Sequence, residues 1–113
     1  MGFRASHRYA RISPTKVRSL ADMIRGKRAD IALDILKYQP QRGARLLEKV
    51  LRSALGNAMD PDQNSGRGAK IEQLVVCDAR VDGGPMFKRV RPRARGMAHV
   101  IKKRTSHISI ELE

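Results

Sequence analysis

An acid-free cationic stretch near the C-terminus constrains the fold of this chain more than any other feature. Between Gly83 and Ile110 the sequence contains eight Lys or Arg residues and no Asp or Glu. Pro and Gly lie near the centre of this stretch, and segments with strand character flank it. Such a composition cannot bury itself in a hydrophobic core, so the stretch is expected to lie against a polyanion. Nucleic acid is therefore the first hypothesis for its partner.

The composition of the whole chain agrees with this hypothesis. The 24 Lys and Arg residues outnumber the 11 Asp and Glu residues, which gives a formal net charge of +13. A length of 113 residues predicts a single domain over residues 1–113 with one modest core. The single cysteine, Cys77, excludes an internal disulfide, fits a reducing cytoplasmic environment and is expected to be a small buried residue of a strand. No apolar run approaches the length of a membrane span, so no membrane partner is expected.

Three helices are predicted in the first half of the chain. Ser13-Pro14 is typical of a helix start, with Ser as N-cap and Pro in the first turn, and Gly26 is expected to end that helix. A second helix is predicted over residues 29–37, where Pro40 follows and prevents its continuation. A third, over residues 42–58, has one apolar side. Its opposite side is interpreted as a solvated surface that carries Arg42, Arg45, Lys49 and Arg52.

Strands are predicted at the N-terminus and on either side of the cationic stretch. Residues 3–12 alternate imperfectly and form a basic strand, and residues 71–81 and 102–112 form two more, the last with one buried face. Helices and strands are segregated, which predicts an α+β fold with three helices packed on a small antiparallel sheet. The long connection over residues 82–101 predicts one long extended β-hairpin that projects from the core.

The sequence has no signature of catalysis or of metal binding. It contains no phosphate-binding P-loop, dinucleotide-binding or nucleophile-elbow motif, and its acids are scattered. The spacing of Cys77 and the three histidines matches no zinc pattern. The segment that starts at Asp60 fails as a calcium loop, because Ser65 and Ile71 stand where Gly and Glu are needed. The chain is therefore predicted to be no enzyme and to have no cofactor.

Two other functions remain open beside RNA binding. The first two helices, joined at Arg25-Gly26-Lys27, could form a helix-turn-helix DNA-binding module, although the second is acidic and apolar where a groove-reading helix needs Arg, Asn or Gln. Gly2 fits a short myristoylation pattern, which would place the chain on a membrane surface. RNA is favoured because the planar guanidinium of Arg binds phosphate bidentately and stacks on exposed bases.

The centre of the cationic stretch predicts an extended arm. Alternation from Arg89 to Arg95 places the arginines largely on one face of a strand, with Val90 and Ala94 on the other. Pro92 interrupts a regular ladder, so the tip of the arm is expected to need outside support. Three apolar residues have no local core and are expected to contact bases or another protein, namely Met86, Phe87 and Met97.

Ordered motifs along the chain resemble those of the large-subunit ribosomal protein twenty-two family. They are Gly84-Pro85-Met86-Phe87-Lys88-Arg89, Arg91-Pro92-Arg93-Ala94 and Lys103-Arg104-Thr105-Ser106-His107-Ile108. Ser13-Pro14-Thr15-Lys16-Val17-Arg18 matches the start of the family's first helix, and Ile24-Arg25-Gly26-Lys27 matches its end. The resemblance covers nearly the whole chain. One departure is Met97, which stands where the family often has Arg.

The resemblance implies a cytoplasmic, structural constituent of the large ribosomal subunit that binds 23S-type rRNA and supports subunit assembly. It also implies that the hairpin lines the exit tunnel beside ribosomal protein four and the nascent polypeptide, and no homo-oligomer is expected. The expected RNA-binding residues of the globular part are Arg4, Arg8, Arg11, Lys16, Arg18, Arg25, Lys27 and Arg28. Those of the hairpin are Met86, Phe87, Lys88, Arg89, Arg91, Pro92, Arg93, Ala94, Arg95, Gly96, Met97, Lys102, Lys103, Arg104 and Thr105.

Overall fold

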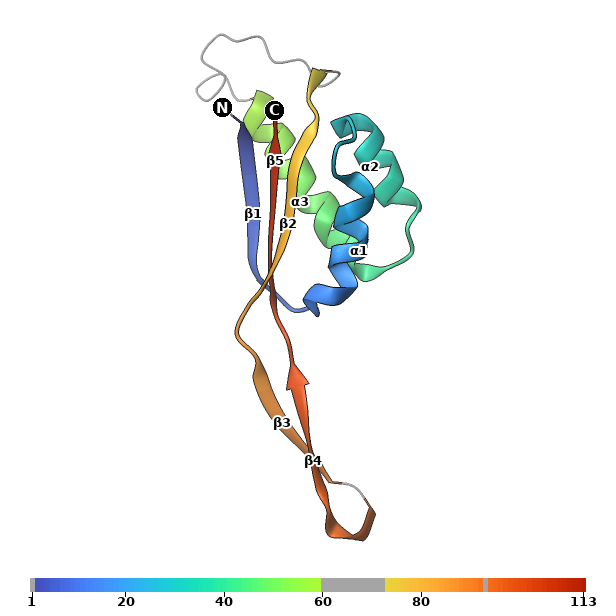
Figure 1. Ribbon diagram of the computed structural model, residues 1–113, viewed down its shortest axis with the longest axis vertical. Helices are drawn as coiled ribbons and strands as arrows, with labels where there is room; N and C mark the ends of the chain where they lie inside the picture. Colours follow the sequence, from blue (N-terminus) through green and yellow to red (C-terminus); the bar gives the residue numbers. More distant parts are fainter. Residues whose placement is uncertain (1, 60–72, 93) are drawn as a thin grey trace.

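The computed structural model describes residues 2–59, 73–92 and 94–113 and confirms the predicted α+β fold (Figure 1). Its core contains the helices α1 (Pro14–Ile24), α2 (Ala29–Tyr38) and α3 (Arg42–Met59). They pack with a three-stranded antiparallel sheet of β1 (Phe3–Ala10), β5 (Ser106–Leu112) and β2 (Val76–Gly83), in the order β1-β5-β2. The predicted loop over residues 60–68 and the hairpin residue Arg93 lie outside the described residues.

The ends of α1 follow the predicted capping pattern only in part. Ser13 is the extended N-cap residue, and Pro14 occupies the first turn. The Ser13 hydroxyl lies 3.0 Å from the hydroxyl of Thr15, and it makes no capping hydrogen bond to the backbone. Gly26 has a φ of +83°, a left-handed conformation that favours glycine, and its N–H donates to the carbonyl of Val76 at 2.8 Å. Because α1 ends at Ile24 and Arg25 is already extended, Gly26 lies just beyond the C-terminus of the helix and joins it to the sheet.

The amphipathic helix α3 supplies the centre of the core. Leu47 and Leu51 on its inner face are fully buried, together with Ile108 and Ile110 of β5. Alternate residues of β5 are buried, as the sequence pattern predicts for a strand with one core face. The long apolar side of α3 thus provides the surface on which the sheet is fixed.

The outer face of α3 is more than a solvated surface. Arg45 and Arg52 form ion pairs with Glu48 at 2.9 and 2.7 Å, and the Glu48 side chain is only 11% exposed. Arg45 also donates to carbonyl oxygens at the end of α2, those of Leu36, Lys37 and Gln39. The predicted cationic side of this helix is thus exposed, with side-chain exposures of 48% for Arg45 and 59% for Arg52, and these two arginines are also paired with Glu48.

Strand boundaries differ from the prediction in three places. β1 ends at Ala10, two residues early, after a register shift between His7 and Ala10. β2 begins at Val76 and continues to Gly83, later at both ends than predicted. The predicted strand over residues 102–112 is two strands, because Arg104 and Thr105 interrupt it.

The expectation that Cys77 is buried is wrong. The register of β2 against β5 shifts between Val76 and Asp78, so Cys77 lies at an irregularity of the ladder. Its side chain is exposed, with the thiol 3.3 Å from the carbonyl oxygen of Glu111. Irregular pairing of this kind interrupts the inward and outward alternation on which the expectation rested.

A second, two-stranded sheet extends away from the core and is called the ribbon here. It consists of β3 (Phe87–Pro92) and β4 (Ala98–Lys103), paired antiparallel, with a short 3-10 turn at Ala94–Gly96. Figure 1 shows the ribbon running along the long axis of the molecule beyond the helices. This makes the molecule elongated, with extents of 66 × 27 × 15 Å. In the described part of the chain, no helix is long and apolar enough to cross a membrane.

Candidate nucleic-acid interface

The ribbon is fixed to the core by a compact set of hydrogen bonds at its base. Thr105, only 5% exposed, donates from its hydroxyl to the carbonyl of Pro85 at 2.7 Å, and its own carbonyl accepts from the Gly84 N–H at 2.9 Å. A Cβ atom at Gly84 would collide with the Thr105 hydroxyl, so only glycine fits there. Ser106 is fully buried and donates to the carbonyl of Ile12 at 2.6 Å. Thr105, an expected RNA contact, therefore lies inside the protein at this junction.

Pairing within the ribbon gives it two chemically different faces. Phe87 pairs with Lys103, Arg89 with Ile101 and Arg91 with His99, and these side chains share one face. The other face carries the pairs Lys88 with Lys102 and Val90 with Val100. The predicted one-sided spacing thus holds for Arg89 and Arg91. Nearly every ribbon side chain is exposed, so the ribbon has no core of its own.

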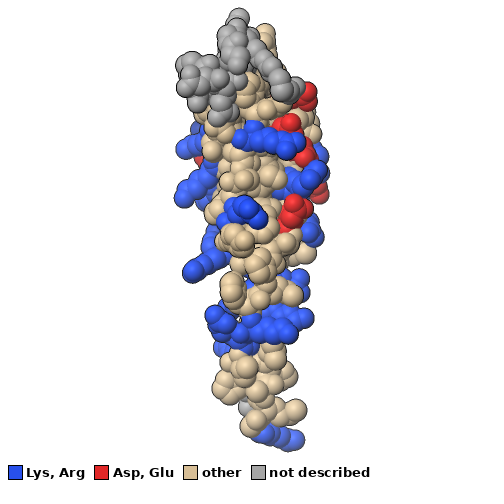
Figure 2. Space-filling model, turned by 90° about the vertical axis from the view of Figure 1, so that its left-hand side faces the viewer, with Lys and Arg blue, Asp and Glu red and all other residues tan. Residues whose placement is uncertain are grey.

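Positive charge gathers on the ribbon and around the end of the core from which it extends. Figure 2 shows Lys and Arg along the whole visible face, whereas Asp and Glu appear only over the core. No acid occurs between Gly83 and Ile110, so the ribbon has no internal partner for its cations. All described hairpin candidates are exposed except Thr105. The surface therefore offers its cations to an external anion.

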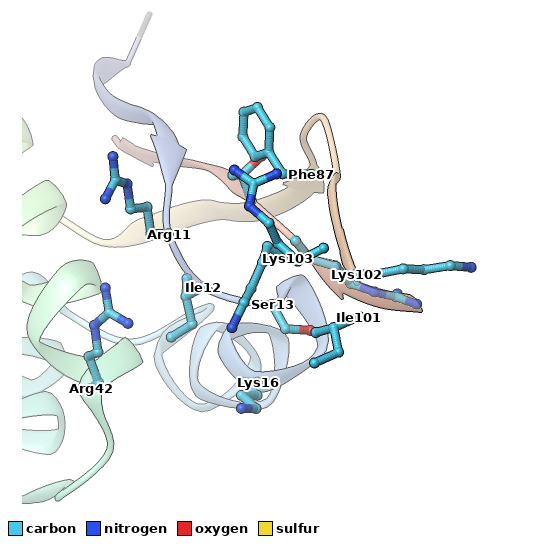
Figure 3. A pocket seen from close by; sticks show the side chains of 12 residues that line it. Arg11, Ile12, Ser13, Lys16, Arg42, Phe87, Ile101, Lys102 and Lys103 are labelled. Atoms are coloured by element: carbon cyan, nitrogen blue, oxygen red, sulfur yellow. The ribbon is translucent and has the colours of Figure 1, made fainter. Parts of the chain in front are cut away.

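A hollow of about 850 Å³ lies where the ribbon joins the core, and we call it the root hollow (Figure 3). Its apolar lining comes from Ile12 after β1, and from Phe87 and Ile101 of the ribbon. Ser13, at the start of α1, also lines it, together with Thr105. The remaining lining residues are all cations: Arg11, Lys16, Arg42, Arg89, Lys102, Lys103 and Arg104. Among the described residues, no Asp or Glu lines the root hollow.

Three segments far apart in the sequence meet at the root hollow. Arg11 and Lys16 flank the start of α1, Arg42 begins α3, and Lys103 ends β4. In Figure 3, Arg11 and Arg42 lie on one side of the view and Ile101 on the other, with Lys103 between them. Of the candidates predicted in the globular part, this site brings together two, Arg11 and Lys16, with the base of the hairpin.

Other predicted cations of the globular part have partners within the protein. Arg4 pairs with Glu111 at 3.0 Å, Arg25 with Asp22 at 2.6 Å and Arg28 with Asp30 at 2.9 Å. Arg25 also donates to the carbonyl of Ala79. The remaining contacts are weaker: the Arg18 side chain donates to the carbonyl of Val81 at 3.2 Å, and Arg8 lies over the Tyr9 ring. Lys27, like the other seven candidates, is exposed.

Asp30 illustrates how acids of the core neutralise nearby cations. Desolvation is the largest single influence on this carboxyl and raises its pKa. Hydrogen bonds from the Ile31 N–H and from Arg28, with the charge of Arg28, together lower the pKa below its ordinary value. The carboxylate therefore stays charged and pairs with Arg28. In this respect Arg28 differs from the cations of the ribbon, which have no acid within their own stretch of sequence.

Sequence reasoning missed several residues of the root hollow. Arg42 was assigned to the solvated side of a helix, Ile12 to the first strand, and Ile101 to the end of the connection over residues 82–101. The available signal for Arg42 was its position at the first turn of α3, where a cation opposes the helix dipole and so indicates an external anion. No local pattern could reveal that Ile12 and Ile101 lie at the same hollow, because tertiary packing alone unites them.

Comparison with known proteins gives consistent results. The family model described as ribosomal protein L22p/L17e matches residues 5–113. The large ribosomal subunit protein uL22 of Rhodopirellula baltica is 69% identical over 110 residues, covering 97% of this chain and 92% of that protein. The protein of the same name from Caldicellulosiruptor saccharolyticus is 48% identical over 109 residues, covering 96% and 85%. That from Desulfotalea psychrophila is 47% identical over 113 residues, covering 100% and 98%.

Proposed function

This chain belongs to the ribosomal protein L22p/L17e family, and from that premise we propose that it binds large-subunit rRNA through the ribbon and the root hollow. As a member of the family it is a structural constituent of the large ribosomal subunit, not a member of an enzyme class. Its place is therefore the ribosome, which in bacteria lies in the cytoplasm. The rRNA contacts are the proposed part of the function.

The observation that carries this proposal is the contrast between paired and unpaired cations. Six cations on the helices and sheet form ion pairs with acids, namely Arg4, Arg25, Arg28, Arg45, Arg52 and Arg80. The ribbon has none within its own stretch, and seven cations surround the root hollow. Unpaired cations at this density repel one another, and bound phosphates relieve that repulsion. RNA would thus complete the charge balance of this half of the molecule.

The ribbon supports a second element of the proposal, a place in the wall of the polypeptide exit tunnel. Its elongated shape allows it to extend beyond the core, and its two faces differ in charge. The face with Arg89 and Arg91 suits rRNA, whereas the face with Val90 and Val100 is apolar at its centre. We expect the part of this face around Val90 and Val100 to be turned to the nascent polypeptide or to a neighbouring ribosomal protein, with ribosomal protein four as the expected neighbour at the tunnel constriction.

A DNA-binding role through α1 and α2 fits the structure less well. The exposed surface of α2 includes Ile31 and Asp34, and its first turn contains Asp30. Acids on a groove-reading helix would repel the phosphates on either side of the groove. The main cationic surface lies instead on the ribbon, which a helix-turn-helix does not use.

Cosedimentation with the large subunit tests the proposed function. The full chain is added to large subunits lacking this protein and centrifuged through a cushion at high salt. We expect retention of the wild type and reduced retention of a variant with Arg89→Gln, Arg91→Gln and Lys103→Gln, because three phosphate contacts are lost. A matched control changes three cations that have partners in the core, namely Arg4, Arg25 and Arg28, to Gln. Equal retention of both variants, or equal competition by duplex DNA, would contradict the proposal.

A further inference from the structure

The root hollow is lined by both cationic and apolar residues, and the phosphates on the surface of an RNA duplex would contact only the cations. Besides its cations, three apolar residues line it, namely Ile12, Phe87 and Ile101. The Phe87 ring is 51% exposed although it belongs to the largest apolar side chains of the chain. Phosphates would satisfy the cations but offer no apolar contact to the exposed Phe87 ring. A ligand that fits the whole lining must combine anionic oxygens with a flat apolar surface.

Phe87 has the properties of a stacking platform. Its ring shares the face of the ribbon that carries Arg89 and Ile101, and it lines the root hollow. The Arg89 guanidinium carbon lies 5.9 Å from the ring centroid, so a planar cation stands beside the aromatic surface. Aromatic rings and guanidinium planes are the groups on which proteins stack unpaired RNA bases. A base could therefore lie against Phe87 while Arg89 holds its own or a neighbouring phosphate.

The root hollow is large enough to hold an unstacked nucleotide. Its volume of about 850 Å³ is within the range of about 300–1,000 Å³ that is usual for small-molecule sites. Bases in an A-form duplex are stacked on each other, and the deep groove is too narrow for side chains to read them. A base can reach a ring inside a concave site only after it leaves the stack.

We propose that the root hollow binds a single unpaired RNA nucleotide, with its base on Phe87 and its phosphates held by Lys103, Arg11 and Arg42. This inference rests on the proposed function and adds the form of RNA that the site selects. An acidic peptide without aromatic residues would satisfy the cations, but it offers no flat ring to Phe87. The nucleotide therefore matches every part of the lining.

The test uses three RNA hairpins of the same stem sequence. One is fully paired, one carries a single bulged adenosine, and one carries an abasic ribose-phosphate at the bulge. The bulged and abasic hairpins have equal charge and differ only in the base. We expect the full chain to bind the adenosine bulge about five- to a hundredfold more tightly than the abasic one, the range that stacking of one base provides. Fluorescence anisotropy at constant salt measures the three affinities.

Variants of the protein locate the effect. Phe87→Ala should remove the preference for the base and leave the affinity for the abasic hairpin unchanged. Lys103→Gln should instead weaken all three hairpins and lower the salt slope by about 0.7–0.9, the change for one phosphate. Val90→Ala is the matched control, because it truncates another exposed apolar residue on the opposite face of the ribbon. Circular dichroism of each variant verifies that the fold is intact.

Three results would overturn the inference: equal binding of the bulged and abasic hairpins, a base preference that survives Phe87→Ala, or competition by polyglutamate as strong as that by RNA. Its failure is separable from failure of the proposed function. A chain that cosediments with the large subunit but ignores the bulged base overturns only the nucleotide site. A chain that does not cosediment overturns both.

Discussion

The core of this protein is stabilised by its own contacts, whereas the ribbon has few stabilising contacts of its own. In the core, apolar side chains such as Leu47 and Ile108 are fully buried, and several cations, Arg45 among them, have acidic partners. In the ribbon, side chains are exposed, and Lys88 lies directly opposite Lys102, a like-charge pair that weakens a two-stranded sheet. An isolated pair of strands is marginal in water even without such repulsion. The core is therefore complete in itself, whereas the ribbon requires an external partner.

Truncation of one apolar residue in each region should give the largest difference between the core and the ribbon. Leu47→Ala should lower the free energy of unfolding by about 2–5 kcal/mol, because Leu47 is fully buried and its loss leaves a cavity. Val90→Ala in the ribbon should change it by less than about 0.5 kcal/mol, because Val90 is 69% exposed. Urea denaturation followed by circular dichroism measures both. Similar losses for the two variants would mean that the ribbon has a core of its own.

A substitution at the junction between the core and the ribbon should lower the free energy of unfolding by an intermediate amount. Thr105→Val keeps the shape of the side chain but removes the hydroxyl that donates to Pro85, leaving that carbonyl without its partner. We expect a loss of about 0.5–1.5 kcal/mol in the free energy of unfolding, the net contribution of a typical hydrogen bond, because Pro85 is exposed and water can replace the lost donor. Hydrogen exchange should also rise at Gly84, whose N–H donates to Thr105.

Thr15→Val is a suitable control for the junction variant. It makes the same chemical change at an exposed threonine of the first turn of α1. Its hydroxyl contacts only that of Ser13, so the free energy of unfolding should change little. Equal effects at Thr105 and Thr15 would argue against a specific role for the junction.

Reversal of one charge should strengthen the ribbon while weakening its function. Lys88→Glu replaces a like-charge pair with an opposite-charge pair across from Lys102, which is worth about 0.2–1 kcal/mol. Amide hydrogen exchange in the free protein should therefore slow in β3 and β4, while affinity for large-subunit rRNA falls. Lys88→Gln, which removes repulsion without adding attraction, should give intermediate protection. Unchanged exchange in both variants would show that charge does not limit ribbon stability.

The same contrast explains how much could be predicted from the sequence. The three helices were predictable because apolar residues repeat along each one, and Ser13, Pro14 and Gly26 mark the ends of α1. The cationic arm was predictable because charge is a property of composition. Neither kind of pattern reveals that the strand is interrupted at Thr105. The sequence there still looks like that of a strand, although the Thr105 hydroxyl donates to the Pro85 carbonyl.

The root hollow could be predicted only in part. Arg11, Lys16 and Lys103 were candidates as cations, and the resemblance motifs included Phe87. Their meeting depends on the path of the chain from β1 into α1 and on the angle at which the ribbon leaves the core. Such geometry comes from contacts between residues far apart in sequence, such as the hydrogen bond from Ser106 to Ile12. Periodicity along one segment carries no information about those contacts.

The smallest predicted effect concerns Cys77, at the edge of the well-packed region. Local desolvation, followed by the charges of Glu111 and Glu113, raises the pKa of its thiol above the ordinary value. The folded thiol thus keeps its proton at a pH where the unfolded one has lost it, so its contribution to stability is present below the unfolded pKa and declines as pH rises through the folded pKa. Alkylation by iodoacetamide at mildly alkaline pH should be slower in the folded than in the urea-unfolded protein.

Glu111→Gln separates charge from desolvation at this thiol. Removal of the carboxylate should lower the pKa of Cys77 and speed its alkylation in the folded state, with the rate constant measured across pH 7.5–10, roughly the range in which cysteine thiols ionise. Asp82→Asn, an exposed acid of the same strand that does not influence Cys77, is the matched control. A rate unaffected by Glu111→Gln would leave desolvation as the cause. Because the folded core and not the ribbon creates this environment, Lys88→Glu should leave the alkylation rate unchanged.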